Sequence, residues 1–142
     1  MLRAALLSIG LLTTSVVTPA LADRMPAPEG ARAYIISPAN GATVSNPVTV
    51  RFGLEGMGVA PAGTEKEKTG HHHLLIDVDP SGIDYNNPLP ADDNHRHFGG
   101  GQTEVTLELP SGAHTLMLLL GDHNHVPHEP PVMSEPVTIT VQ

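Results

Sequence analysis

Three pairs of histidines in this sequence have a spacing that suits metal chelation. The pairs are His71 with His73, His95 with His97, and His123 with His125. In an extended chain, residues i and i+2 point to the same face and lie about 6.5–7 Å apart along the backbone. Two imidazoles at that spacing can converge on one ion above a strand. One such pair is a common coincidence, whereas three in a chain of 142 residues indicate a metal site.

The last pair belongs to a dense polar stretch, GDHNHVPHE, which follows an aliphatic run. The stretch also contains Asp122, a carboxylate that could support a ligand, and two methionines elsewhere offer thioether donors. Imidazoles and thioethers in a chain without cysteine favour copper, as Cu(I) or Cu(II), and also suit zinc. The candidate metal ligands are His71, His73, His97, His123, His125, His128, Met57 and Met133.

Other histidines have ordinary structural interpretations. His72 shares the strand face of Leu74 and Ile76, so we expect it to face the core and to form hydrogen bonds there. His114 follows a turn and is expected to be structural. The three pairs themselves have two further interpretations: a cluster of imidazoles that responds to pH, and a hydrogen-bonded scaffold without a ligand.

The segments that carry these residues predict an all-β fold. Short β-prone runs are separated by Pro, Gly and Asn, which break strands and form turns. The runs lie at 33–37, 48–54, 72–78, 103–109, 114–120 and 137–141. Six or seven short strands with turns between them predict an immunoglobulin-like antiparallel β-sandwich.

The segment PSGA predicts how two of these strands pair. It separates 103–109 from 114–120, so we expect an antiparallel hairpin. The start of the first strand and the end of the second are neighbours in such a hairpin. His97 and His123 should then lie at the same end of the sheet. Whether His71 and His73 reach that end depends on a pairing that the sequence does not determine.

The beginning of the chain predicts export. Residues 1–22 combine Arg3, an apolar stretch and the small residues Ala20 and Ala22, which is the order of a secretory signal peptide. The apolar stretch is short for a membrane span. We therefore expect a periplasmic protein with no membrane insertion after cleavage. Its predicted parts are the signal peptide at 1–22, a flexible leader at 23–33 and a single β-sandwich domain at 34–142.

The net charge and the absence of known catalytic motifs argue against some classes of function. A formal net charge of −8 makes nucleic acid a poor partner and favours cations. The sequence contains no nucleophile elbow, phosphate-binding loop or zinc-protease helix, so we do not expect an enzyme. We predict a protein that binds copper or transfers it to or from a periplasmic metal donor or acceptor protein. The alternative is an envelope interaction module that binds no metal and has structural histidines.

Long strings of this sequence resemble a known bacterial family. GHHHLLID and the run from HFGGGQTEVTLEL to PVTITV are similar to the exported DUF4399 family, over about Tyr34 to Val141. Because that family has no assigned function, the resemblance implies no activity. PANGATVSNPVTVRF is also similar to the first strands of periplasmic copper carriers with immunoglobulin-like sandwiches. That resemblance implies His and Met ligands on loops at one end of a barrel.

Overall fold

The structure is a computed structural model that describes residues 23–142. The predicted signal peptide, residues 1–22, lies outside the described residues. In the described part, strands dominate and the one helical element is a short 3-10 turn at Pro80–Gly82. No helix in that part is long and apolar enough to cross a membrane. The prediction of an all-β chain is therefore confirmed.

Three strands form the smaller sheet. They are β1 (Arg32–Ser37), β3 (Val48–Glu55) and β7 (Glu104–Leu107), in the order β1-β3-β7. Both pairings are antiparallel. Alternate residues of β3 such as Val50 and Phe52 are buried, because that face of the strand packs against residues of the larger sheet.

The larger sheet has six strands. Its main order is β2 (Thr43–Val44), β9 (Val137–Val141), β8 (Gly112–Gly121), β5 (Thr69–Ile76) and β4 (Gly58–Val59), and β6 (His95–His97) also pairs with β5. The long strands are antiparallel, but β2 with β9 and β4 with β5 are parallel. The sheet is therefore mixed, and the antiparallel prediction holds for the pairings of β5, β6, β8 and β9 but fails for the two-residue strands β2 and β4.

The predicted hairpin is wrong. β7 pairs with β3 in the smaller sheet, whereas β8 lies between β5 and β9 in the larger one. The side chain of Asn46 holds the chain between β7 and β8, because it donates to the Leu109 carbonyl at 2.7 Å and accepts from the Leu109 amide at 3.0 Å. The end of β8 is buried on both faces and needs a central position, while β7 alternates between exposed and half-buried residues.

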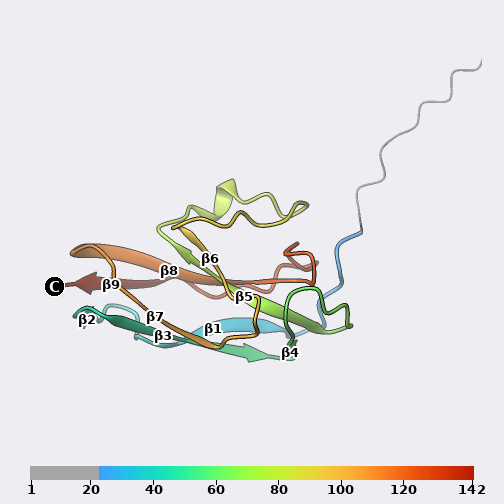
Figure 1. Cartoon of the computed structure of the whole chain (residues 1–142), viewed down its shortest axis with the longest axis horizontal. Coiled ribbons are helices and arrows are strands. Elements are labelled where there is room, and N and C mark those ends of the chain that lie inside the picture. The colour runs from blue at the N-terminus through green and yellow to red at the C-terminus, as the bar shows by residue number, and fades with distance from the viewer. Residues whose placement is uncertain (1–22) are drawn as a thin grey trace, which may run out of the picture.

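The main core lies between the two sheets (Figure 1). Apolar residues of β5, β8 and β9 face Val48, Val50 and Phe52 of β3 in this core. His72 also points into this core, with its ring centroid 5.2 Å from that of Phe52. It faces the core as expected, but neither ring nitrogen has a hydrogen-bond partner among the described residues, so the predicted hydrogen bonds are absent. Burial lowers the pKa of His72 to about 4, which keeps the ring neutral.

A second apolar cluster covers the outer face of the larger sheet. It joins Leu75, Met117 and Leu119 of the sheet to Leu89 of the long excursion between β5 and β6. Figure 1 shows this excursion, with its 3-10 turn, on the side of β8 away from the smaller sheet. Because side chains alternate along β5, His71 and His73 face this outer side while His72 faces the main core. The excursion therefore partly encloses the two outward histidines.

The start of the segment predicted as a flexible leader lies against the end of the loop that follows β8. Arg24 donates to the Pro127 carbonyl at 2.9 Å and forms an ion pair with Glu129. Pro26 forms a parallel bridge with Glu129. These contacts attach the chain around Arg24 and Pro26 to the loop that follows the last histidine pair.

Candidate metal centre

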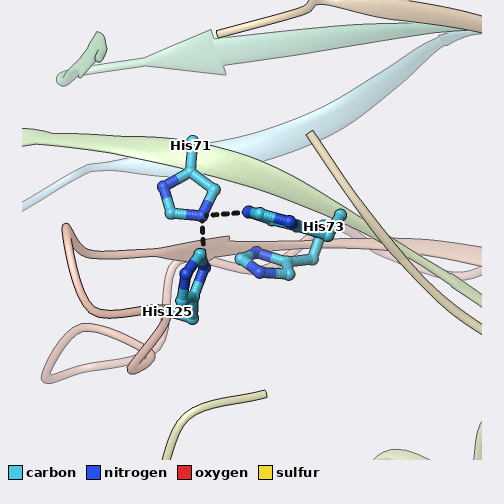
Figure 2. A group of neighbouring side chains, drawn as sticks. His71, His73 and His125 are labelled. Atoms are coloured by element: carbon cyan, nitrogen blue, oxygen red, sulfur yellow. Dashed lines mark hydrogen bonds between the residues drawn. The ribbon is translucent and has the colours of Figure 1, made fainter. Parts of the chain in front are cut away.

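Four imidazoles meet on the outer face of the larger sheet. Each of His71, His73, His97 and His125 offers one ring nitrogen, and these four nitrogens all lie within 4.8 Å of one another. Figure 2 shows the rings of His71, His73 and His125 turned toward a common region. The four residues come from β5, β6 and the turn after β8, so three distant segments build one cluster. This cluster, called the histidine centre below, could hold a metal ion.

Strand register explains three of the four positions. β5 runs between β6 and β8, and its outward residues His71 and His73 lie two positions apart. His97 of β6 is directly opposite His73, and the two rings stack with centroids 5.1 Å apart. Gly121 of β8 is directly opposite His71. The pairing of β5 with its neighbours thus places three imidazoles side by side without any help from loops.

A tight turn places the fourth imidazole. The buried carboxylate of Asp122 accepts from the amides of Asn124 at 2.8 Å and Val126 at 3.0 Å. The Asp122 carbonyl also accepts from the His125 amide at 3.0 Å. His125 itself has a left-handed backbone, φ 67°, which is uncommon for a residue other than glycine. This conformation brings its ring centroid to 4.4 Å from that of His97 and 4.9 Å from that of His71.

Ring nitrogens of three of these histidines lie close together. His71 Nε2 is 2.9 Å from His125 Nδ1 and 3.1 Å from His97 Nε2. A neutral imidazole has one donor and one acceptor nitrogen, so a single nitrogen cannot form two good hydrogen bonds at once. Nδ1 of His71 and Nδ1 of His73 are buried, and neither has a hydrogen-bond partner among the described residues. A cation at the centre would use the converging lone pairs.

Burial keeps the inner rings in the form that binds metal. Burial, and then the nearby rings of His125 and His97, lower the pKa of His71 to about 4, while Asp122 opposes the shift. For His73, burial and then His71, His97 and His125 lower the pKa to about 3. The pKa of His97 is also lowered, by burial and then by His125. Metal ligation requires a neutral imidazole, so at pH 7 these rings need not release a proton.

Two glycines make room for the rings. A Cβ at Gly121 would lie 2.6 Å from Cε1 of His73 and 3.2 Å from the His125 Cα, both too close. A Cβ at Gly99 would lie 2.6 Å from Nε2 of His97. We did not predict these glycines as part of a site from the sequence. Their positions beside the histidine pairs, in LLLGDHNH and HRHFGGG, are the available sequence signal.

The other candidate ligands lie elsewhere. His123 Nε2 accepts from the side-chain amide of Asn124 at 2.8 Å, and its ring is outside the histidine centre. His128 is fully buried, and its Nε2 donates to the Thr69 carbonyl at 3.1 Å. Met57 packs against the main core, and Met133 packs against the outer apolar cluster. The structure therefore brings together one imidazole pair, His71 with His73, and one member of each other pair.

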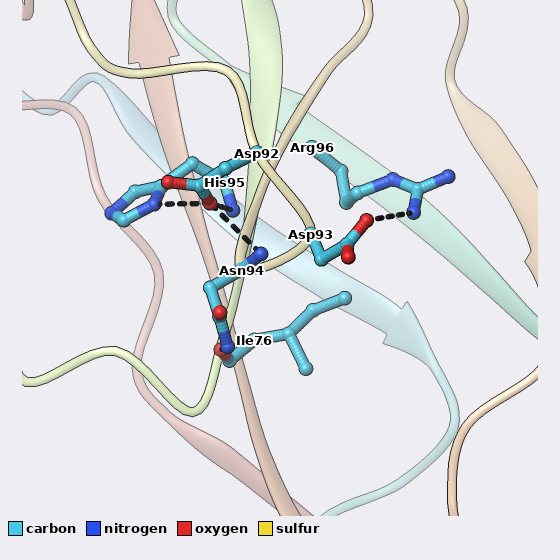
Figure 3. Close-up of polar contacts among 6 residues, drawn as sticks. All are labelled: Ile76, Asp92, Asp93, Asn94, His95 and Arg96. Carbon is cyan, nitrogen blue, oxygen red and sulfur yellow. Dashed lines mark hydrogen bonds and ion pairs between the residues drawn. The ribbon is translucent and has the colours of Figure 1, made fainter.

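His95 supports the centre from outside. Its Nδ1 is 2.8 Å from the carboxylate of Asp92, which also accepts from the amides of Asn94 and His95 (Figure 3). Asn94 donates from its side chain to the Ile76 carbonyl at 2.8 Å. The hydrogen bond from His95 is the main cause that lowers the pKa of Asp92. These bonds fix the chain just before β6 and so help to position His97.

His114 lies far from the centre along β8 and has two acceptor partners. Its Nδ1 is 2.7 Å from the carboxylate of Asp77, and its Nε2 is 2.7 Å from the Pro110 carbonyl. Both bonds can form only if both ring nitrogens carry a proton. The bond to Asp77, and then the bond to Pro110, raises the pKa of His114 above the ordinary 6.5.

We expect the ring of His114 to titrate above pH 6.5 in the folded protein, and Asp77→Asn to lower that midpoint. Because the folded-state pKa is raised, the stabilisation is fully present below pH 6.5 and is lost as the pH rises through the folded-state value. NMR of the histidine ring protons during a pH titration measures the midpoint. Asp79→Asn is the control, since Asp79 bonds to Ser81 instead. A midpoint of 6.5 or lower in the unmodified protein contradicts the expectation.

Comparison with known proteins assigns the chain to a group without giving it an activity. A family model described as a domain of unknown function matches residues 50–142. The match starts within β3 and includes all four residues of the histidine centre. No curated protein and no solved structure matches the chain. The family resemblance expected from the sequence is confirmed, and the argument for function rests on the geometry of the site.

Proposed function

Because this chain belongs to the DUF4399 family, a domain of unknown function, we propose its function from its own geometry: it is a metal-binding protein whose metal is copper. The observation that carries the proposal is the convergence of four ring nitrogens, within 4.8 Å of one another, from three segments of the chain. Hydrophobic burial and strand register hold the rings in place before any ion binds. The cluster is thus largely organised in advance for a cation.

The separations between the nitrogens support a four-coordinate site. With a metal–nitrogen distance of about 2.0–2.1 Å, neighbouring ligands lie about 3.4 Å apart in a tetrahedron, or about 2.9 Å apart in a square with diagonals of about 4.1 Å. The observed separations from His71 Nε2 are 2.9 Å to His125 and 3.1 Å to His97. These two short edges fit the square arrangement, which Cu(II) favours. Small ring movements would bring all four nitrogens into contact with one ion.

The types of donor atom also support copper. Magnesium and calcium prefer oxygen ligands, and the histidine centre offers nitrogen. The chain contains no cysteine that would provide a thiolate. Among divalent ions, a nitrogen site binds Cu(II) more tightly than Zn(II). Zinc is the second candidate, because four imidazoles can also surround it as a tetrahedron.

The remaining parts of the proposal come from the sequence. The signal peptide predicted at 1–22 supports a periplasmic location. A role in binding or transferring the ion, with a periplasmic donor or acceptor protein as partner, follows from a site that is formed in advance and open on one side. The two-layer arrangement of the sheets supports an immunoglobulin-like sandwich as the finer description of the fold.

A metal titration tests the proposed function. The mature protein, stripped with chelator, should take up one equivalent of Cu(II) and melt at a higher temperature. Ligand at 100 times its Kd stabilises the folded state by about 2.7 kcal/mol. Electron paramagnetic resonance should show nitrogen ligands, and elemental analysis of untagged protein from its own periplasm should identify the resident metal. An unchanged melting temperature in excess copper and zinc would reject the proposal and favour the metal-free interaction module, in which the bonds between histidines are purely structural.

A further inference from the structure

The four ligands differ in their access to solvent. His71 and His73 are 0% and 1% exposed, His125 is half-buried, and His97 is exposed. The hydrogen-bonded strand pairings show the same contrast. β5 carries the buried pair and is bonded to β8 along six residue pairs, whereas β6 carries His97 and is bonded to β5 along three. The centre therefore has an inner side that is held firmly and an outer side that faces water.

His97 is the ligand that can move with the least disturbance. β6 is a three-residue strand beside β5, and beyond the buried Phe98 that follows it come Gly99, Gly100 and Gly101. Glycine permits backbone changes that other residues resist, and Gly101 already has a φ of 83°. A rotation of His97 away from the centre would leave the pairing of β5 with β8 intact. Movement of His71 or His73 would disrupt the pairing of β5 with β8 and the packing of the buried residues around it.

We propose that copper enters and leaves through this outer side by associative exchange, and that His97 is the first ligand displaced. The inference rests on the proposed function. A donor atom of the incoming molecule forms a bond to the ion while His71 and His73 still hold it, and the bond from the ion to the His97 ring breaks. His97 leaves as a neutral imidazole, and the oxidation state of the copper does not change.

The outer side also defines the chemical class of the partner. The incoming group must offer a nitrogen or sulfur donor, since these compete with imidazole for copper. It must be slender, because the chain around Ala62 borders the exposed ring: a Cβ at Gly99 would lie 2.6 Å from His97 Nε2 and 3.2 Å from the Ala62 Cβ. The Ala62 amide also donates to the Gly99 carbonyl at 2.8 Å. A peptide segment that presents imidazole, amide nitrogen or thioether donors fits this access.

Stopped-flow transfer of Cu(II) from the loaded protein to the tripeptide Gly-Gly-His tests the mechanism. Associative exchange predicts a rate that rises in proportion to the tripeptide concentration. A rate independent of that concentration would mean that copper dissociates first, and it would overturn the inference. Failure of the protein to bind Cu(II) at all is a separate result, visible in the preceding titration, and it would reject the proposed function itself.

Two variants test the route. Ala62→Phe should obstruct the outer side and slow both loading and removal at least about tenfold, an added barrier of about 1.4 kcal/mol, without changing Kd. His97→Asn should speed transfer at least about tenfold, because one position is already open. His123→Asn, which changes a ring outside the histidine centre, should leave the rate unchanged. Circular dichroism checks that each variant is folded. Unchanged rates in folded Ala62→Phe would overturn the inference, and if that variant does not fold, the concentration dependence and the His97 variant decide.

Discussion

His125→Asn should weaken Cu(II) binding by more than about 100-fold, because loss of a supporting group behind a ligand alone costs about 10–100-fold and this change removes the ligand itself. His125 Nδ1 lies 2.9 Å from His71 Nε2, at one edge of the four-nitrogen arrangement. Asparagine suits the test because it tolerates the left-handed backbone found at this position. The turn around Asp122 should therefore persist while the imidazole is lost. Competition titration with a chelator of known affinity measures the change.

His123→Asn is the matched control. His123 is two residues away in the same turn, but its ring is bonded to Asn124 and lies outside the histidine centre. Its removal should leave Cu(II) affinity nearly unchanged. Melting of both variants without metal would show that neither change disrupts the fold. Equal losses of affinity in the two variants would contradict the assignment of His125, and so would no loss in either.

Gly121→Ala should also weaken Cu(II) binding, because it adds a methyl group to the backbone position beside two of the ligands. The new methyl would lie 2.6 Å from Cε1 of His73 and 3.2 Å from the His125 Cα. The ring of His73 cannot move far, since His73 is only 1% exposed and its ring stacks on that of His97. We expect a loss of Cu(II) affinity of about 100-fold or more, comparable with the loss of a ligand or its support. Overpacking of this kind should also lower the stability of the metal-free protein by about 1–3 kcal/mol.

A second glycine in a strand provides the comparison for this prediction. A Cβ at Gly58 in β4 would meet the methyl group of Thr69 at 3.6 Å, an ordinary contact. Gly58→Ala should therefore change neither Cu(II) affinity nor stability much. Chemical denaturation and the same competition titration apply to both variants. Wild-type affinity in Gly121→Ala would show that the close fit between Gly121 and the His73 ring has no role in holding the metal.

Local patterns in the sequence predicted the strands and the direction of their side chains. The run 137–141 coincides with β9, and the run 114–120 lies within β8. The i, i+2 spacing correctly put His71 and His73 on one face and His72 on the other. These features depend on the alternation of side chains along one extended chain, which neighbouring residues determine. The donor types and the lack of cysteine are likewise properties of the sequence alone.

Pairing between distant strands could not be predicted in this way. The expected hairpin of β7 with β8 was wrong, because β7 pairs with β3. His97 still reaches the site, because its own strand, β6, pairs with β5. The loop after β8 gave no indication that His125 would turn inward while His123 remained outside. That difference depends on the turn bonded to Asp122 and on a left-handed backbone at one residue.

The sequence by itself therefore determined the kind of chemistry: nitrogen donors, spaced for chelation, on short strands of an acidic chain. The tertiary structure alone decided which imidazoles converge, which one faces water, and that the cluster lies on the outer face of the larger sheet. The physical reason is that alternation along a strand is a local property. The choice of partner strand depends instead on how buried faces pack across the whole domain.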